Sequence, residues 1–125
     1  MNVSISRSSF QNNSGGGIRL DTTPGAAITA AISDSTISLN VASGLNALGS
    51  SSNMMVNLLR DVIASNGAAG VQANGATAAV LVNGTALLNN SSALSAVGGG
   101  RILTYGNNSI VGPAGSAFTG TASLQ

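Results

Sequence analysis

The chain has 125 residues and a net charge of +1, carried by four arginines and three aspartates, and it contains no histidine, cysteine or tryptophan. Without a basic cluster or stacking aromatic rings it lacks what nucleic-acid binding usually needs, so we expect no nucleic-acid partner. Serine catalysis would lack its histidine and a zinc site would lack both histidine and cysteine, so the sequence predicts no cofactor and no metal site.

Residues 1–125 are expected to form one folded domain, because Val, Ile and Leu recur regularly and the mean hydropathy is positive. The longest apolar runs, such as residues 78–82, are far too short for a membrane-spanning helix, which needs about 18 to 20 residues. Residues 1–7 do not show the basic and apolar regions of a signal peptide.

The first predicted elements are short strands in which apolar side chains alternate with other types. Val3 and Ile5 form one such pair, Ile18 and Leu20 form another, and Phe10 lies between them. A period of two predicts strands that point one side chain into the protein and the next outward. Gly, Asn and Ser fill the intervening segments, which we expect to form turns.

The same spacing recurs along the chain. The second copy is displaced from the first by about 27 residues, the third by about 26 more, and the fourth by about 24 and then 23, because a turn is shortened. A partial fifth copy ends in Pro113 and Ala117-Phe118. Two neighbouring inward columns are therefore predicted, the first of Ile5, Ile32, Leu58, Val82 and Tyr105 and the second of Phe10, Ile37, Ile63, Leu87 and Ile110.

A period of about 23 to 27 residues is compatible with a leucine-rich repeat or with a β-solenoid. The dense leucine consensus of the first class is missing, whereas the short alternating runs are typical of the second. The sequence therefore predicts a β-solenoid of about four to five coils.

One polar slot recurs together with the strands. A short amide in such a slot can adopt the left-handed backbone conformation and hydrogen-bond in register with the next copy, which predicts a buried asparagine ladder. The expected ladder consists of Asn13, Asn40, Asn66 and Asn90.

With these columns, residues 8–13, 17–20 and 99–108 resemble coils of the right-handed parallel β-helix repeat proteins. That architecture is shared by bacterial pectate-lyase-like enzymes, phage tailspikes and many surface proteins. The resemblance implies an all-β, right-handed parallel β-helix and an extracellular or cell-surface location. It implies no particular activity, because one scaffold hosts many unrelated functions.

Asp34 occupies the slot of Arg7 one coil earlier and of Arg60 one coil later, so the three side chains are expected to stack on one outer face. We prefer to interpret this column as a surface charge ladder. The alternative, which follows polysaccharide-cleaving relatives, makes Asp34 a catalytic base or ligand and uses an arginine to stabilise an anionic substrate. Asp61 fits either interpretation, and Asp21 is expected to be a turn-forming acceptor.

A solenoid exposes unpaired strand edges at its end coils unless something caps them, and the sequence contains no obvious cap. The chain is therefore expected to be a fragment or a minimal module. The preferred function is a non-catalytic structural or binding module of a bacterial surface or secreted protein. It would self-associate by end-to-end coil stacking into a dimer or fibre and contact carbohydrate weakly. The alternative is a fragment or relative of a polysaccharide lyase or hydrolase that acts on acidic polysaccharide.

Overall fold

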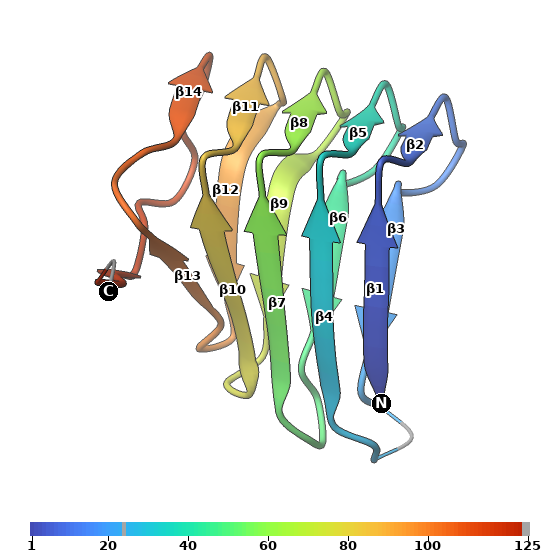
Figure 1. Cartoon of the computed structure of the whole chain (residues 1–125), viewed down its shortest axis with the longest axis vertical. Coiled ribbons are helices and arrows are strands. Elements are labelled where there is room, and N and C mark those ends of the chain that lie inside the picture. Colours follow the sequence, from blue (N-terminus) through green and yellow to red (C-terminus); the bar gives the residue numbers. More distant parts are fainter. Residues whose placement is uncertain (24, 124–125) are drawn as a thin grey trace.

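The computed structural model describes residues 1–23 and 25–123, and its regular elements are all β-strands (Figure 1). The first twelve strands follow one another in groups of three, and each of these groups forms one coil of a β-solenoid. Four complete coils are followed by an incomplete fifth coil. The predicted all-β solenoid is therefore confirmed. Within the described residues, no helix is long and apolar enough to span a membrane.

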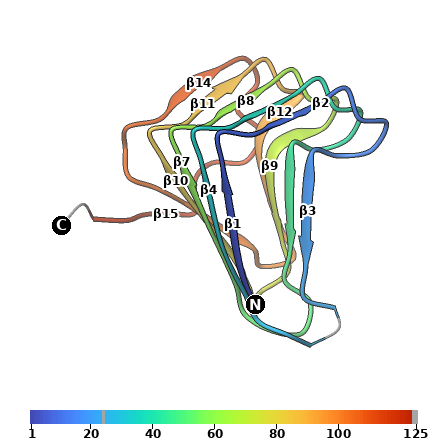
Figure 2. The same cartoon turned by 45° about the vertical axis from the view of Figure 1, so that its right-hand side comes forward.

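Corresponding strands of successive coils pair in parallel and form three sheets, which enclose the core (Figure 2). Sheet A runs in the order β1 (Asn2–Ser6), β4 (Ile28–Ser33), β7 (Met54–Leu59), β10 (Ala78–Asn83), β13 (Arg101–Thr104) and β15 (Gly120–Thr121). Sheet B consists of β2 (Ser9–Gln11), β5 (Thr36–Ser38), β8 (Val62–Ala64), β11 (Ala86–Leu88) and β14 (Ser109–Val111). Sheet C consists of β3 (Ile18–Asp21), β6 (Leu45–Leu48), β9 (Ala69–Asn74) and β12 (Ser92–Val97).

Alternation along the strands separates the core from the surface. In β7, Met54, Val56 and Leu58 are buried, whereas the residues between them lie on the outer face. The inward side chains of neighbouring coils stack into continuous columns because parallel strands pair in register. The largest of these side chains that are fully shielded from solvent include Ile32, Ile37, Leu45, Ile63 and Leu87.

The register confirms the first four copies of the predicted repeat. Ile5 pairs with Ile32 and Ile32 with Leu58, and Leu58 pairs with Val82, which reproduces the predicted displacement at each step. The second column, from Phe10 through Ile37, Ile63 and Leu87 to Ile110, is confirmed over its whole length.

The predicted place of Tyr105 is wrong. Val82 pairs with Thr104, so Tyr105 lies just after β13 and outside the inward column. The displacement from the fourth coil is longer at Ile110 than at Thr104, which means that an extra residue lies in the intervening bend. Gly106 has a φ of 81° in that bend and lets the longer chain turn there.

The predicted register of the fifth coil in sheet C is also wrong. Leu94 forms its bridge with Gly115, whereas the predicted register would have placed Phe118 opposite it. Pro113 does occupy the ladder position of the fifth coil, next to Asn90 of the fourth. Its carbonyl accepts a hydrogen bond from the main-chain N–H of Ala93. Phe118 packs against the core cluster. The fifth coil therefore loses the regular register of the first four.

Two bends in each of the first four coils contain a left-handed residue. Between sheets A and B, Arg7, Asp34, Arg60 and Gly84 have φ values of 48°, 51°, 56° and 57°. Between sheets B and C, positive φ values occur at the residue before each ladder asparagine, namely Asn12, Leu39, Ser65 and Asn89. The expectation that the ladder asparagines themselves adopt this conformation is wrong, because the preceding residue makes the turn and the asparagine turns its amide inward.

Candidate functional site

The four asparagines form the predicted ladder. The amide nitrogen of Asn13 donates to Oδ1 of Asn40 at 2.8 Å, and the Asn40 and Asn66 amides donate to the next Oδ1 at 2.9 Å. Asn40, Asn66 and Asn90 are each 2% exposed, whereas Asn13 is exposed because it lies in the first coil. Each buried amide also donates to a main-chain carbonyl of the preceding coil. The ladder therefore ties the first four coils together inside the bend.

The charged column on the outer face contains one close ion pair. Nε and Nη2 of Arg60 donate to the two carboxylate oxygens of Asp34 at 2.8 and 3.0 Å. The hydrogen bonds from Arg60 hold the pKa of Asp34 below its usual value, and Arg7 contributes only a longer-range attraction. Both oxygens of Asp34 are thus occupied, and a carboxylate with a lowered pKa is a weaker base than a free one.

A second polar ladder follows the bend between sheets A and B, and the sequence pattern did not reveal it. The main-chain N–H of Ser35 donates to Oδ1 of Asp61 at 2.9 Å, and the N–H of Thr85 donates to Oδ1 of Asn108 at 2.8 Å. The side-chain types differ from coil to coil, so no single residue type marks the column. A constant offset from the asparagine ladder could have found it. Its members are Ser8, Ser35, Asp61, Thr85 and Asn108.

Asp61 is the one carboxylate of the second ladder and is 1% exposed. Burial raises the pKa of Asp61 to about 6, against the hydrogen bonds from the main-chain N–H groups of Ser35 and Leu59. The side chain therefore belongs to the interior, although Arg60 next to it lies on the outer face. Neither the surface ladder nor the catalytic interpretation describes it.

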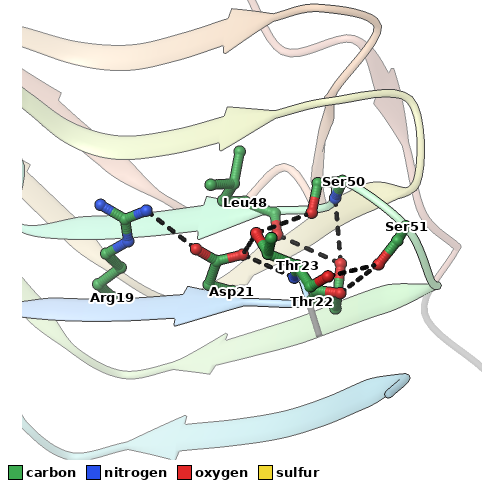
Figure 3. A network of polar contacts seen from close by, with 7 residues as sticks. All are labelled: Arg19, Asp21, Thr22, Thr23, Leu48, Ser50 and Ser51. Carbon is green, nitrogen blue, oxygen red and sulfur yellow. Dashed lines mark hydrogen bonds and ion pairs between the residues drawn. The ribbon is translucent and has the colours of Figure 1, made fainter. Parts of the chain in front are cut away.

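Asp21 is a turn-forming acceptor, as predicted (Figure 3). Its Oδ1 accepts hydrogen bonds from the main chain and the hydroxyl of Thr23, and its Oδ2 lies 2.9 Å from Nη2 of Arg19. These contacts, the Thr23 hydroxyl foremost, lower the pKa of Asp21 to about 2. Ser50 and Ser51 of the next coil complete the network. Pro24, which belongs to the predicted turn, lies outside the described residues.

A groove of about 360 Å³ crosses the first three coils beside sheet C. Arg19, Asn46 and Gln72 occupy one outward slot of successive coils, so guanidinium and amide groups follow one another along the groove. Ala42 and Ala68 are among its small lining residues. Oδ1 of Asn46 is buried and accepts no hydrogen bond from the described residues. The lining offers hydrogen-bonding groups and no aromatic platform.

The two ends of the solenoid differ. The edge of β1 that faces away from β4 has no partner strand in the described part of the chain. Val3, Ile5 and Phe10 of this first coil are only partly buried. At the other end, Phe118 packs against the core. The fifth coil has a single bridge, between Leu94 and Gly115, where the earlier coils have a sheet C strand.

No protein-family model matches the chain, and searches among curated proteins and solved structures give no match. Among residues 1–23 and 25–123, no three acidic, histidine or cysteine side chains lie close enough together to hold a metal ion. The interpretation of the site therefore depends on its own geometry.

Proposed function

We propose that the chain is a non-catalytic structural or binding repeat module that joins a second copy through its open first coil. The carrying observation is the free edge of β1, which presents unpaired main-chain groups beside a partly exposed core. Following the resemblance to β-helix proteins, we include a bacterial surface or secreted location in this proposal. Weak carbohydrate contact along the groove beside sheet C also belongs to it, supported by the amides of Asn46 and Gln72.

The apolar surface of the first coil supports association. Val3, Ile5 and Phe10 occupy the same columns as Ala30, Ile32 and Ile37, which are 0% exposed once a coil covers them on each side. Covering the first coil would bury the same kind of surface, at a gain of about 25 cal/mol per Å². Strand addition at the β1 edge would satisfy its main-chain groups at the same time.

The second copy would present its own first coil. Its fifth coil is a poor partner, because Pro113 offers neither an N–H nor a side-chain amide in the ladder slot and the register there is irregular. Two first coils can instead meet around a two-fold axis, with β1 antiparallel to its copy. Such a contact is closed, so the expected assembly is a dimer and not a fibre.

Light scattering across a wide concentration range tests this proposal. We expect the unmodified chain to reach a plateau at the dimer mass. Val3→Lys should dissociate the dimer because it places a charge in the inward column, whereas Ser4→Lys puts the same charge on the outer face of the same strand and should leave the dimer intact. A monomer at all concentrations, a mass that keeps growing, or a dimer that survives Val3→Lys would each contradict the proposal.

The alternative of a lyase or hydrolase fragment requires a free base on the outer face. The two contacts between Asp34 and Arg60 and the lowered pKa of Asp34 count against it. Incubation with acidic polysaccharides and detection of new unsaturated or reducing ends separates the two functions. Depolymerisation that disappears in a folded Asp34→Ala variant would replace our proposal with the enzymatic one.

A further inference from the structure

Asp61 is exceptional among the side chains of the second ladder. It lies between Ser35 of the second coil and Thr85 of the fourth, and its own N–H is 3.4 Å from the Thr85 hydroxyl. Its Oδ1 and Oδ2 accept the main-chain N–H groups of Ser35 and Leu59 at 2.9 and 3.0 Å. The carboxyl is thus a hydrogen-bonded part of the contact between the second and third coils.

The neighbouring ladder hydroxyls act as donors as well as acceptors. The hydroxyl of Ser35 donates to the carbonyl of Ser33 at 2.9 Å, and the hydroxyl of Thr85 donates to the carbonyl of Asn83 at 3.2 Å. Each of these acceptors lies two positions earlier in the chain. A charged carboxylate has no proton for the equivalent carbonyl of Leu59, whereas a protonated carboxyl has one.

Two nearby charged side chains influence the ionisation of the buried Asp61 carboxyl, and they act in opposite directions. Asp34 of the second coil disfavours its charged form and Arg60 favours it. The fourth coil contributes Gly84 and Thr85 at these positions, neither of which is ionisable. Arg60 also binds both oxygens of Asp34, so it is not a dedicated partner of Asp61. Desolvation therefore remains the largest influence on the ionisation of Asp61.

We propose that Asp61 makes the contact between the second and third coils pH-dependent. The two coils are held together more firmly when the Asp61 carboxyl is protonated than when it is charged. Between the pKa of an unfolded aspartate and that of Asp61, the folded chain binds more protons than the unfolded chain. The free energy of unfolding therefore falls as the pH rises through this interval. The exposed Asp34 and the partly exposed Asp21 have lowered pKa values and act below it, where their stabilisation is lost on acidification.

Urea unfolding between pH 4 and pH 8 measures the predicted pH dependence of the free energy of unfolding. A pKa raised from 3.8 to about 6 corresponds to an increase of up to about 100-fold in the unfolding equilibrium constant across this range. Asp61→Ser copies Ser35 and should remove most of the pH dependence while making the chain more stable at pH 8. Asp34→Asn is the matched control, and it should keep the pH dependence.

Two further measurements keep the proposal testable if Asp61→Ser does not fold. Asp61→Asn copies Asn108 of the same ladder and should give the same flat profile. Hydrogen exchange at the Ser35 amide of the unmodified chain should show an opening equilibrium that increases from pH 4 to pH 8. Unmodified stability that does not change over this range, or a pH dependence that persists in the folded serine or asparagine variant, would overturn the inference.

Discussion

At the scale of single residues, the asparagine ladder stabilises the solenoid because one amide serves as donor and acceptor at once. Oδ1 of Asn66 accepts both the main-chain N–H and the side-chain amide of Asn40. Its nitrogen donates to Asn90 and to the carbonyl of Ile37. Aspartate in this slot would lack the donors, and serine would be too short to serve both neighbouring coils. The amide is therefore the side chain that the slot requires.

Replacing Asn66 by alanine should lower the free energy of unfolding by about 3 kcal/mol, because several buried polar groups lose their partners together. Asn13→Ala is the matched control and should cost about 1 kcal/mol or less, since Asn13 is exposed and lies at the end of the ladder. Urea unfolding of both variants measures the difference. Equal losses would show that burial does not control the contribution of a ladder amide.

At the scale of elements, the bends share one backbone conformation although their residue types differ. In the first four coils a left-handed residue precedes each polar ladder position, and its side chain points to solvent at Arg60, Leu39 and Asn89. Left-handed conformations cost a bulky side chain about 1 to 2 kcal/mol, whereas asparagine tolerates them. Leu39, with a φ of 56° and 53% exposure, is the member of this set that fits its conformation least well.

Leu39→Asn should therefore raise the free energy of unfolding by about 0.5 to 1 kcal/mol. The variant copies Asn12 and Asn89, which hold the equivalent position in other coils. Val41→Asn is a suitable control because Val41 is 68% exposed on the same corner and is not among the residues with positive φ. Thermal unfolding compares the two, and a similar effect of both variants would attribute the gain to the loss of an exposed apolar side chain and not to the backbone.

The elements also show which features a sequence can reveal. Periodic apolar residues located the strands of four coils, because stacking in register demands a nearly constant displacement. Tyr105 was misplaced since the bend at Gly106 holds an extra residue, where the core imposes no spacing. No single residue type marks the second ladder, because hydroxyl, carboxyl and amide groups can all accept the same main-chain N–H. Its constant offset from the asparagine ladder is the signal that the sequence does contain. Asp34 and Arg60 were correctly placed side by side, as both project from equivalent bend positions.

At the scale of the whole molecule, each coil contacts only its neighbours, so stability is approximately a sum of coil terms and interfaces between coils. The third coil has a regular coil on both sides, whereas the fourth has one on one side only. The fifth coil keeps its pairing in sheets A and B, but a single bridge takes the place of its sheet C strand. Opening should therefore begin at the C-terminal end and reach the second and third coils, each of which has a regular coil on both sides, last.

A pair of cavity variants in one column tests this gradient. Ile63 is 0% exposed and stacks between Ile37 and Leu87, whereas Ile110 is partly exposed and pairs with Leu87 alone. Ile63→Ala should cost about 3 to 4 kcal/mol and speed hydrogen exchange in every coil, because the central interfaces hold both halves together. Ile110→Ala should cost about 1 to 2 kcal/mol and speed exchange in β13 to β15 only. If both variants changed exchange evenly along the chain, the solenoid would unfold as one cooperative unit, and the irregular fifth coil would be as firmly held as the centre.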